Sequence, residues 1–129
     1  MLKKMCIVAG LVAVFGLNVS LSTDAATPKG DPTKGKATFV EKCAPCHGQQ
    51  GKGDGPAGAA LNPKPRNQSD VKYMSTLTDE HIFKVIKDGG ASVGKSPAMP
   101  AWGSVLSNDD IWNVIAYVRK DICKCEYKK

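Results

Sequence analysis

Cys43, Cys46 and His47 are the residues whose types and spacing point most directly to chemistry. They form the motif Cys-Ala-Pro-Cys-His, a C-x-x-C-H pattern that is typical of covalent haem attachment. Within one tight turn, two thiols can add to the two haem vinyl groups while the histidine ring reaches the iron. One short segment would thereby fix a porphyrin at three points.

Three other interpretations of this motif have to be weighed. A thioredoxin-type redox pair needs a preceding strand, whereas the flanking residues predict a helix and a glycine-rich loop. A zinc site could use Cys43, Cys46, Cys123 and Cys125, but it leaves His47 without a role. A structural disulfide between the first two cysteines, with an incidental histidine, is the third. Haem attachment explains more of the motif than any of these.

The segment 1–25 has the pattern of a secretory signal peptide. Two lysines precede an apolar run from Met5 to Leu17, which is shorter than the roughly 20 residues that span a bilayer. Small residues near Ala25 suit a cleavage site. We therefore expect export to the periplasm and a mature domain of residues 26–129, with a retained membrane anchor as the alternative.

The chain has 129 residues and a formal net charge of +6, which indicates one small, basic domain. It has no lysine and arginine runs interleaved with aromatic residues, so nucleic-acid binding is not expected. The positive charge instead favours docking to redox proteins with acidic surfaces. We expect a monomer with no membrane association once the signal is removed.

Helical patterns must position the motif. A first helix is predicted to begin at the Asp31-Pro32 pair and to reach about Cys43. Because Pro45 disfavours helical conformation at the residue before it, the haem-binding turn is predicted to interrupt this helix. Residues 48–70, rich in glycine and proline, should form a long irregular loop, and wrapping a cofactor is one function of such a loop.

Two further main helices follow this loop. Thr78 should cap one that stops at Gly89, and Ser107 should cap another over about residues 108–121, with a short turn at 72–74 before them. No strand pattern is present, so an all-α fold is expected. Three modest helices bury little apolar surface, and a haem would complete their core.

Taken together, CAPCH at 43–47, the glycine-rich loop behind it, SPAMPAWG at 96–103 and IWNVIAYVRK at 111–120 resemble the class I c-type cytochromes. The resemblance covers essentially the whole mature chain. It implies a small all-α cytochrome c fold, with three main helices and short turns around one covalently bound haem c.

The resemblance also implies contacts and ligands, which are assigned residue by residue. Gly35 and Phe39 on the first helix should pack against Tyr117 on the last. Met99, flanked by prolines, should be the sixth iron ligand opposite His47, and its weak thioether would raise the reduction potential.

Several assignments around the haem stay open. Met74 and His81 compete with Met99 as ligands, although they are better suited to a core gap-filler and a partly exposed helix position. Similarity to the family also suggests that a proline carbonyl, of Pro63 or Pro65, accepts a hydrogen bond from the ligand histidine. Arg66 or Trp102 is expected to contact a haem propionate, with a solvated arginine and a packed tryptophan as the alternatives.

Cys123-Lys124-Cys125 departs from the family pattern. An intrachain bond between residues two apart requires the last helix to end by about Ile122. A small disulfide ring, an intermolecular bridge and free thiols are all open. No second C-x-x-C-H motif exists, so one haem is expected.

These features together predict a single-electron carrier and not an enzyme. A carrier needs an iron closed by two protein ligands, whereas a haem enzyme or gas sensor needs an open position. The alternative is a haem-based ligand sensor or enzyme subunit with a labile methionine ligand.

Overall fold

The first helix of the computed structural model, α1 (Pro32–Thr38), begins where the Asp31-Pro32 pair predicts. The structure describes residues 29–128, so the predicted signal segment 1–25 lies outside the described residues. The Asp31 carboxylate accepts hydrogen bonds from the backbone amides of Thr33 and Lys34. Pro32 occupies the first helical position, where a missing amide hydrogen costs nothing.

The helix does not break at the C-x-x-C-H turn, so the predicted interruption was wrong. A π-helical turn, η1 (Phe39–Cys43), leads directly into α2 (Ala44–His47). Ala44 has helical angles (φ −61°, ψ −29°), and its amide donates to the Phe39 carbonyl five residues back. Pro45, which has no amide hydrogen to donate, directly follows this widened turn, and the helical conformation continues through it to His47.

The glycine- and proline-rich segment after His47 forms no helix or strand before α3 (Val71–Met74), as predicted. α4 (Asp79–Asp88) begins at its Thr78 cap and ends at Gly89, also as predicted. A short 3₁₀ turn, η2 (Gly90–Val93), then opens the loop that carries Met99.

The last helix, α5 (Asn108–Tyr117), starts from a capping box in which the side chains and backbones of Ser107 and Asp110 bond reciprocally. It continues as a π-helical turn, η3 (Val118–Ile122). Because the helical segment ends at Ile122, Cys123 and Cys125 are able to form an intrachain disulfide, which is the state in the structure. Lys124 between them adopts a positive φ of 51°.

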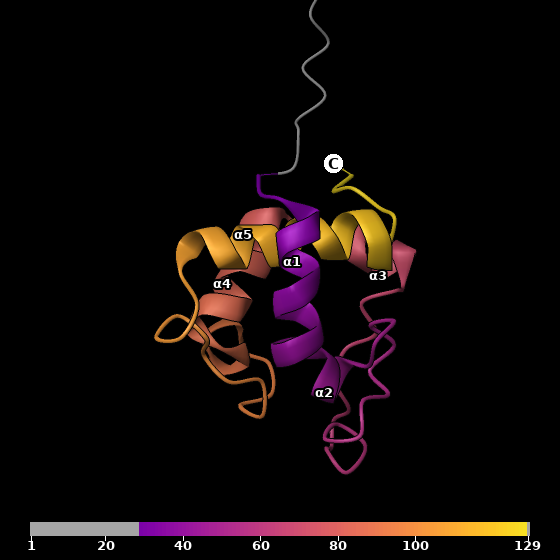
Figure 1. The fold of residues 1–129 in the computed structure, drawn as a ribbon. Helices are drawn as coiled ribbons and strands as arrows, with labels where there is room; N and C mark the ends of the chain where they lie inside the picture. Colours follow the sequence, from indigo (N-terminus) through magenta and orange to yellow (C-terminus); the bar gives the residue numbers. More distant parts are fainter. Residues whose placement is uncertain (1–28, 129) are drawn as a thin grey trace, which may run out of the picture.

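α1 crosses α5 at the top of the view in Figure 1, and this crossing is the main helix contact of the fold. A Cβ atom on Gly35 would lie 1.8 Å from the Asn113 carbonyl oxygen, so only glycine permits this close approach. The Phe39 and Tyr117 rings pack with centroids 5.3 Å apart. The contact expected from Gly35, Phe39 and Tyr117 is therefore confirmed.

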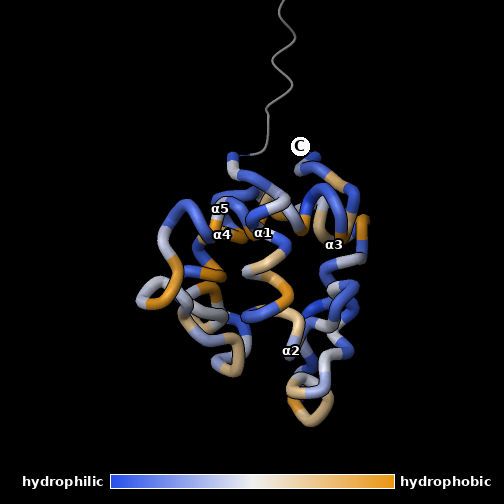
Figure 2. The backbone as a smooth tube through the Cα atoms, in the orientation of Figure 1, coloured by the Kyte–Doolittle hydropathy of each residue, from blue (hydrophilic) through white to orange (hydrophobic). Residues whose placement is uncertain are grey.

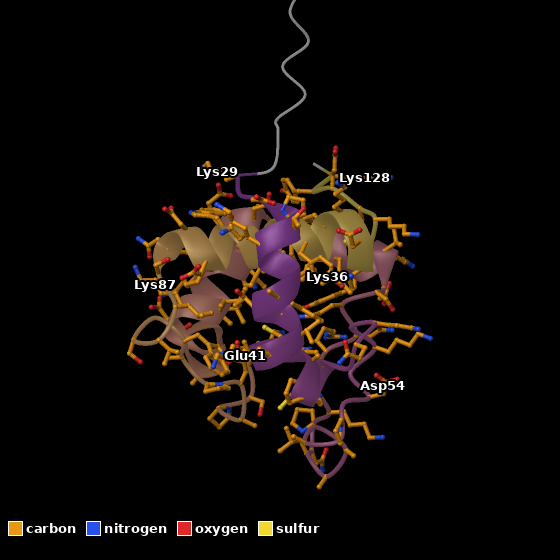
Figure 3. The ribbon with its side chains drawn as sticks, viewed as in Figure 1. Lys29, Lys36, Glu41, Asp54, Lys87 and Lys128 are labelled. Carbon is orange, nitrogen blue, oxygen red and sulfur yellow. A yellow bond between two sulfur atoms is a disulfide. The ribbon has the colours of Figure 1, made fainter. Side chains whose placement is uncertain are left out.

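The hydrophobic core is built mainly from residues of η1, α4, α5 and η3, joined by single residues of α2 and α3. The helices alternate hydrophobic and hydrophilic residues along the chain in Figure 2, as expected for elements with one buried side. The charged side chains labelled in Figure 3, such as Lys29, Lys87 and Lys128, lie around the outside. Residues 29–128 contain no strand, which confirms the all-α class, and within them no helix is long and apolar enough to cross a membrane.

Candidate functional site: an apolar cavity beside the C-x-x-C-H turn

One cavity of about 460 Å³ opens between the loop that follows α2 and the loop that follows η2. This volume is in the usual range for sites that hold a cofactor, about 300–1,000 Å³. The two loops lie on opposite sides of α1 in Figure 1. The structure brings every residue singled out for haem binding to this cavity: Cys43, Cys46, His47, Pro65, Arg66, Met99 and Trp102.

The two cysteines of the motif reach the cavity from η1 and α2, and neither is disulfide-bonded. Cys43 is buried and Cys46 is partly buried. Burial, and secondarily the neighbouring Cys46 sulfur, raise the pKa of the Cys43 thiol to about 12. The site therefore presents a neutral thiol at physiological pH, as an apolar pocket favours.

His47 is oriented by a backbone carbonyl, but not by the one expected. Its Nδ1–H donates to the carbonyl oxygen of Arg66, 3.1 Å away, and not to that of Pro63 or Pro65. The Pro65 carbonyl lies against Gly53, where an added Cβ would be only 2.2 Å from its oxygen. The next carbonyl along the chain is the one that His47 meets, so the proline assignment was wrong.

This hydrogen bond fixes which ring nitrogen of His47 is free. With Nδ1 protonated and bonded, Nε2 keeps its lone pair. Burial lowers the pKa of the ring, and the hydrogen bond to Arg66 opposes this only in part. His47 is therefore a neutral imidazole at physiological pH, which is the form that binds a metal ion.

Met99 is held in its loop by backbone bonds on both sides. The Gly90 amide donates to the Met99 carbonyl over 2.9 Å, and the Met99 amide donates to the Ser96 carbonyl over 3.2 Å. The side chain is partly buried against the core. Met74 and His81 also line the cavity, so the structure leaves both in competition with Met99 for the iron.

Polar groups at the cavity wall fit a ligand with both apolar and anionic parts. The Arg66 guanidinium lies over the Tyr73 ring, 4.0 Å from its centroid. The side-chain oxygen of Gln68 is buried without a hydrogen-bond partner, and rotation of its amide would present a donor instead. The Trp102 backbone amide donates to the Ile86 carbonyl over 2.9 Å, which fixes this residue at the wall.

The same geometry argues against the other interpretations of the motif. Cys123 and Cys125 bond to each other, so they are not available to a zinc site with Cys43 and Cys46. Among the residues that the structure describes, no three histidine, cysteine or carboxylate side chains gather as a metal cluster. The segment before the motif is a helix and not the strand that a thioredoxin-type pair requires.

Comparison with known families decides between haem attachment and the other interpretations of the C-x-x-C-H motif. A family model described as cytochrome c oxidase, cbb3-type, subunit III, matches residues 30–118. The chain belongs to the c-type cytochromes. Members of this family carry covalently bound haem c and transfer electrons, so the expected cofactor is confirmed together with the fold class.

Relatives of this c-type cytochrome include long and short proteins. The cbb3-type cytochrome c oxidase subunit FixP of Azorhizobium caulinodans is 38% identical over 67% of this chain, but the chain spans only 28% of that subunit. Cytochrome c6 of Bryopsis maxima is 34% identical, and the match covers 72% of this chain and 94% of that protein.

A solved structure supports the fold. Cytochrome cL of the methylotrophic bacterium Methylophaga aminisulfidivorans superposes with a TM-score of 0.51 and 24% identity over 69% of this chain and 51% of that one. At this level of identity the likeness concerns the fold alone. The cavity of this c-type cytochrome nonetheless fits haem c on its own residues: two unpaired thiols, an imidazole with a free Nε2 and a thioether line one largely apolar space.

Proposed function

We propose that this c-type cytochrome is an exported monohaem carrier of single electrons. Cys43 and Cys46 would form the thioether bonds, while His47 and Met99 would be the two iron ligands. The observation that carries the proposal is that all four side chains line the same cavity, with the His47 ring oriented through Nδ1. Residues 1–25 would direct export to the periplasm, and the mature chain would be a monomer.

The residues of the chain would each have a distinct part in this function. The haem, when bound, supplies reversible one-electron exchange at its iron. The Arg66 carbonyl keeps the His47 ring in one orientation and makes the imidazole a better electron donor. Met99 would close the remaining position, which leaves no place for a substrate. The alternative function, a haem-based ligand sensor or enzyme subunit, would require Met99 to dissociate from the iron.

One set of measurements on the purified protein tests this proposal. We expect the visible spectrum to show a low-spin haem in both oxidation states, with no rapid binding of carbon monoxide. The colour should stay with the protein in acid-acetone, since thioether bonds survive denaturation. The intact mass should correspond to residues 26–129 plus one haem. Colour lost to the solvent would contradict covalent attachment, and rapid carbon monoxide binding would favour the sensor.

The redox partner would be a protein with an acidic docking surface. No carboxylate lines the cavity, whereas four cationic side chains do, namely those of Lys42, Lys64, Arg66 and Lys95. Lys42 is paired with Glu41 at 2.7 Å, so the other three carry the local positive charge. The relatives named as cbb3-type oxidase subunits make a membrane-bound oxidase complex one candidate partner.

Small redox reagents of opposite charge test the docking surface. Oxidation of the reduced protein by the anion ferricyanide should slow about tenfold between low and physiological ionic strength, because salt screens the steering. Lys64→Gln with Lys95→Gln should slow it at low salt, whereas Lys36→Gln with Lys128→Gln should have little effect. Oxidation by a cationic cobalt(III) complex should be slowed neither by salt nor by the lysine substitutions. Equal salt dependence for both reagents would exclude the proposed surface.

A further inference from the structure

The hydrogen bond that orients His47 depends on a segment without regular structure. Arg66, whose carbonyl accepts it, lies between the end of α2 and the start of α3, where the chain forms no helix or strand. On one side this segment is tied to the glycine loop, because the Gln68 amide donates to the Gly51 carbonyl over 2.6 Å. A second support on the other side of Arg66 is needed if its carbonyl is to stay within hydrogen-bond distance of the His47 Nδ1.

The Tyr73 ring supplies that second support. The Arg66 guanidinium lies 4.0 Å from the centroid of this ring, which is within the range of a cation–π contact. Arg66 is otherwise exposed, while Tyr73 is partly buried against the core. The arginine side chain is thus anchored on a ring that the fold itself holds.

Tyr73 is a firm anchor because α3 is capped at its N-terminus and tied to other helical segments at its C-terminus. The Asp70 side chain accepts a hydrogen bond from the Tyr73 amide at the N-terminus. At the other end, the buried Arg119 donates to the Met74 carbonyl over 2.7 Å and pairs with Asp79 over 2.8 Å. The C-terminal end of α3 is therefore bound to η3 and, through Arg119, to α4.

We propose that Tyr73 is a positioning residue for the iron ligand, acting through Arg66: its ring holds the guanidinium, and the Arg66 backbone then holds the His47 ring. This inference rests on the proposed function, since it takes His47 to be an iron ligand. In this role the Tyr73 ring contacts neither the iron nor His47.

Solvent exchange of the His47 Nδ1 proton measures this support directly. In the reduced, diamagnetic protein the proton can be followed by NMR, and its exchange requires the Arg66 carbonyl to move away. Tyr73→Leu should raise the exchange rate about threefold, as expected from the loss of one exposed cation–π contact. Tyr73→Phe keeps the ring and should exchange like the parent.

Controls separate this role from a general effect on folding. Phe83→Leu removes another ring that faces a cationic side chain, that of Lys87 at 5.6 Å, but Phe83 does not line the cavity, so exchange at His47 should be unchanged. Arg66→Leu should raise the rate as Tyr73→Leu does, and the double variant should show no further increase. The thermal midpoint of each variant reports any global loss of stability.

Each outcome decides the proposal. An additional increase in the double variant would show that Tyr73 acts by another route, and an unchanged rate in Tyr73→Leu or Arg66→Leu would overturn the proposal. If Tyr73→Leu does not fold, the Arg66→Leu and Tyr73→Phe variants still test it. A parent protein without a low-spin haem would instead contradict the proposed function, so the two failures are distinguishable.

Discussion

Replacing both Cys43 and Cys46 with alanine should leave a colourless chain that no longer unfolds cooperatively on heating. The cavity beside them is lined by core residues of α4 and α5, including Ile82, Ile86 and Val114. Without the haem, these apolar walls would face water that enters the open cavity, so the chain would lose a large part of its buried apolar surface. The whole stability of a small domain is only about 5–15 kcal/mol, so such a loss should abolish cooperative folding.

The measurement is a thermal melt followed by circular dichroism at a helical wavelength. A matched control changes the other two cysteines, because Cys123→Ala with Cys125→Ala leaves the cavity untouched. That variant should keep its colour and its cooperative melt. So short a disulfide loop contributes only about 1–2 kcal/mol to the free energy of unfolding through chain entropy, to which the lost packing of the two buried sulfur atoms adds. A sharp melt of the Cys43 and Cys46 variant near that of the parent would show that the core does not need the cofactor.

The parts of the fold that depend on local chemistry were predictable from the sequence. Thr78 and Ser107 cap α4 and α5 because their side chains bond to backbone amides within the same turn. Gly89 ends α4, again through its own backbone conformation, with a positive φ of 82°. Such signals are contained in a few consecutive residues, so no knowledge of the tertiary structure is needed.

The errors concern features that a local rule describes incompletely. The rule that proline disfavours a helical residue before it is a preference, and at Ala44 a widened turn and the packing of η1 outweigh it. The carbonyl partner of His47 depends on where the loop meets Gly53, a contact that only the folded chain defines. The Arg119 network, which links η3 to α3 and α4 across some 40 residues, had no signal in the sequence pattern.

Replacing Met99 with histidine should lower the midpoint potential of the haem by on the order of one to a few tenths of a volt, within the roughly 0.8 V that axial ligands span. The substitution would keep two protein ligands but exchange a weak thioether for a better electron donor, which stabilises ferric iron. Met74→Leu is the matched control, since Met74 lines the same cavity. If Met74 is only a core side chain, the midpoint potential of the Met74→Leu variant should stay near that of the parent protein.

Truncation of the same residue should open the site. Met99→Ala would leave His47 as the one protein ligand of the iron, so we expect a high-spin or water-ligated spectrum and much faster binding of cyanide or carbon monoxide. Because Met99 is held by the Gly90 and Ser96 backbone and is only partly buried, the loop should keep its shape when the side chain is shortened. An unchanged spectrum and potential in Met99→Ala would transfer the ligand role to Met74 or His81, and His81→Gln and Met74→Ala would then identify which of the two binds the iron.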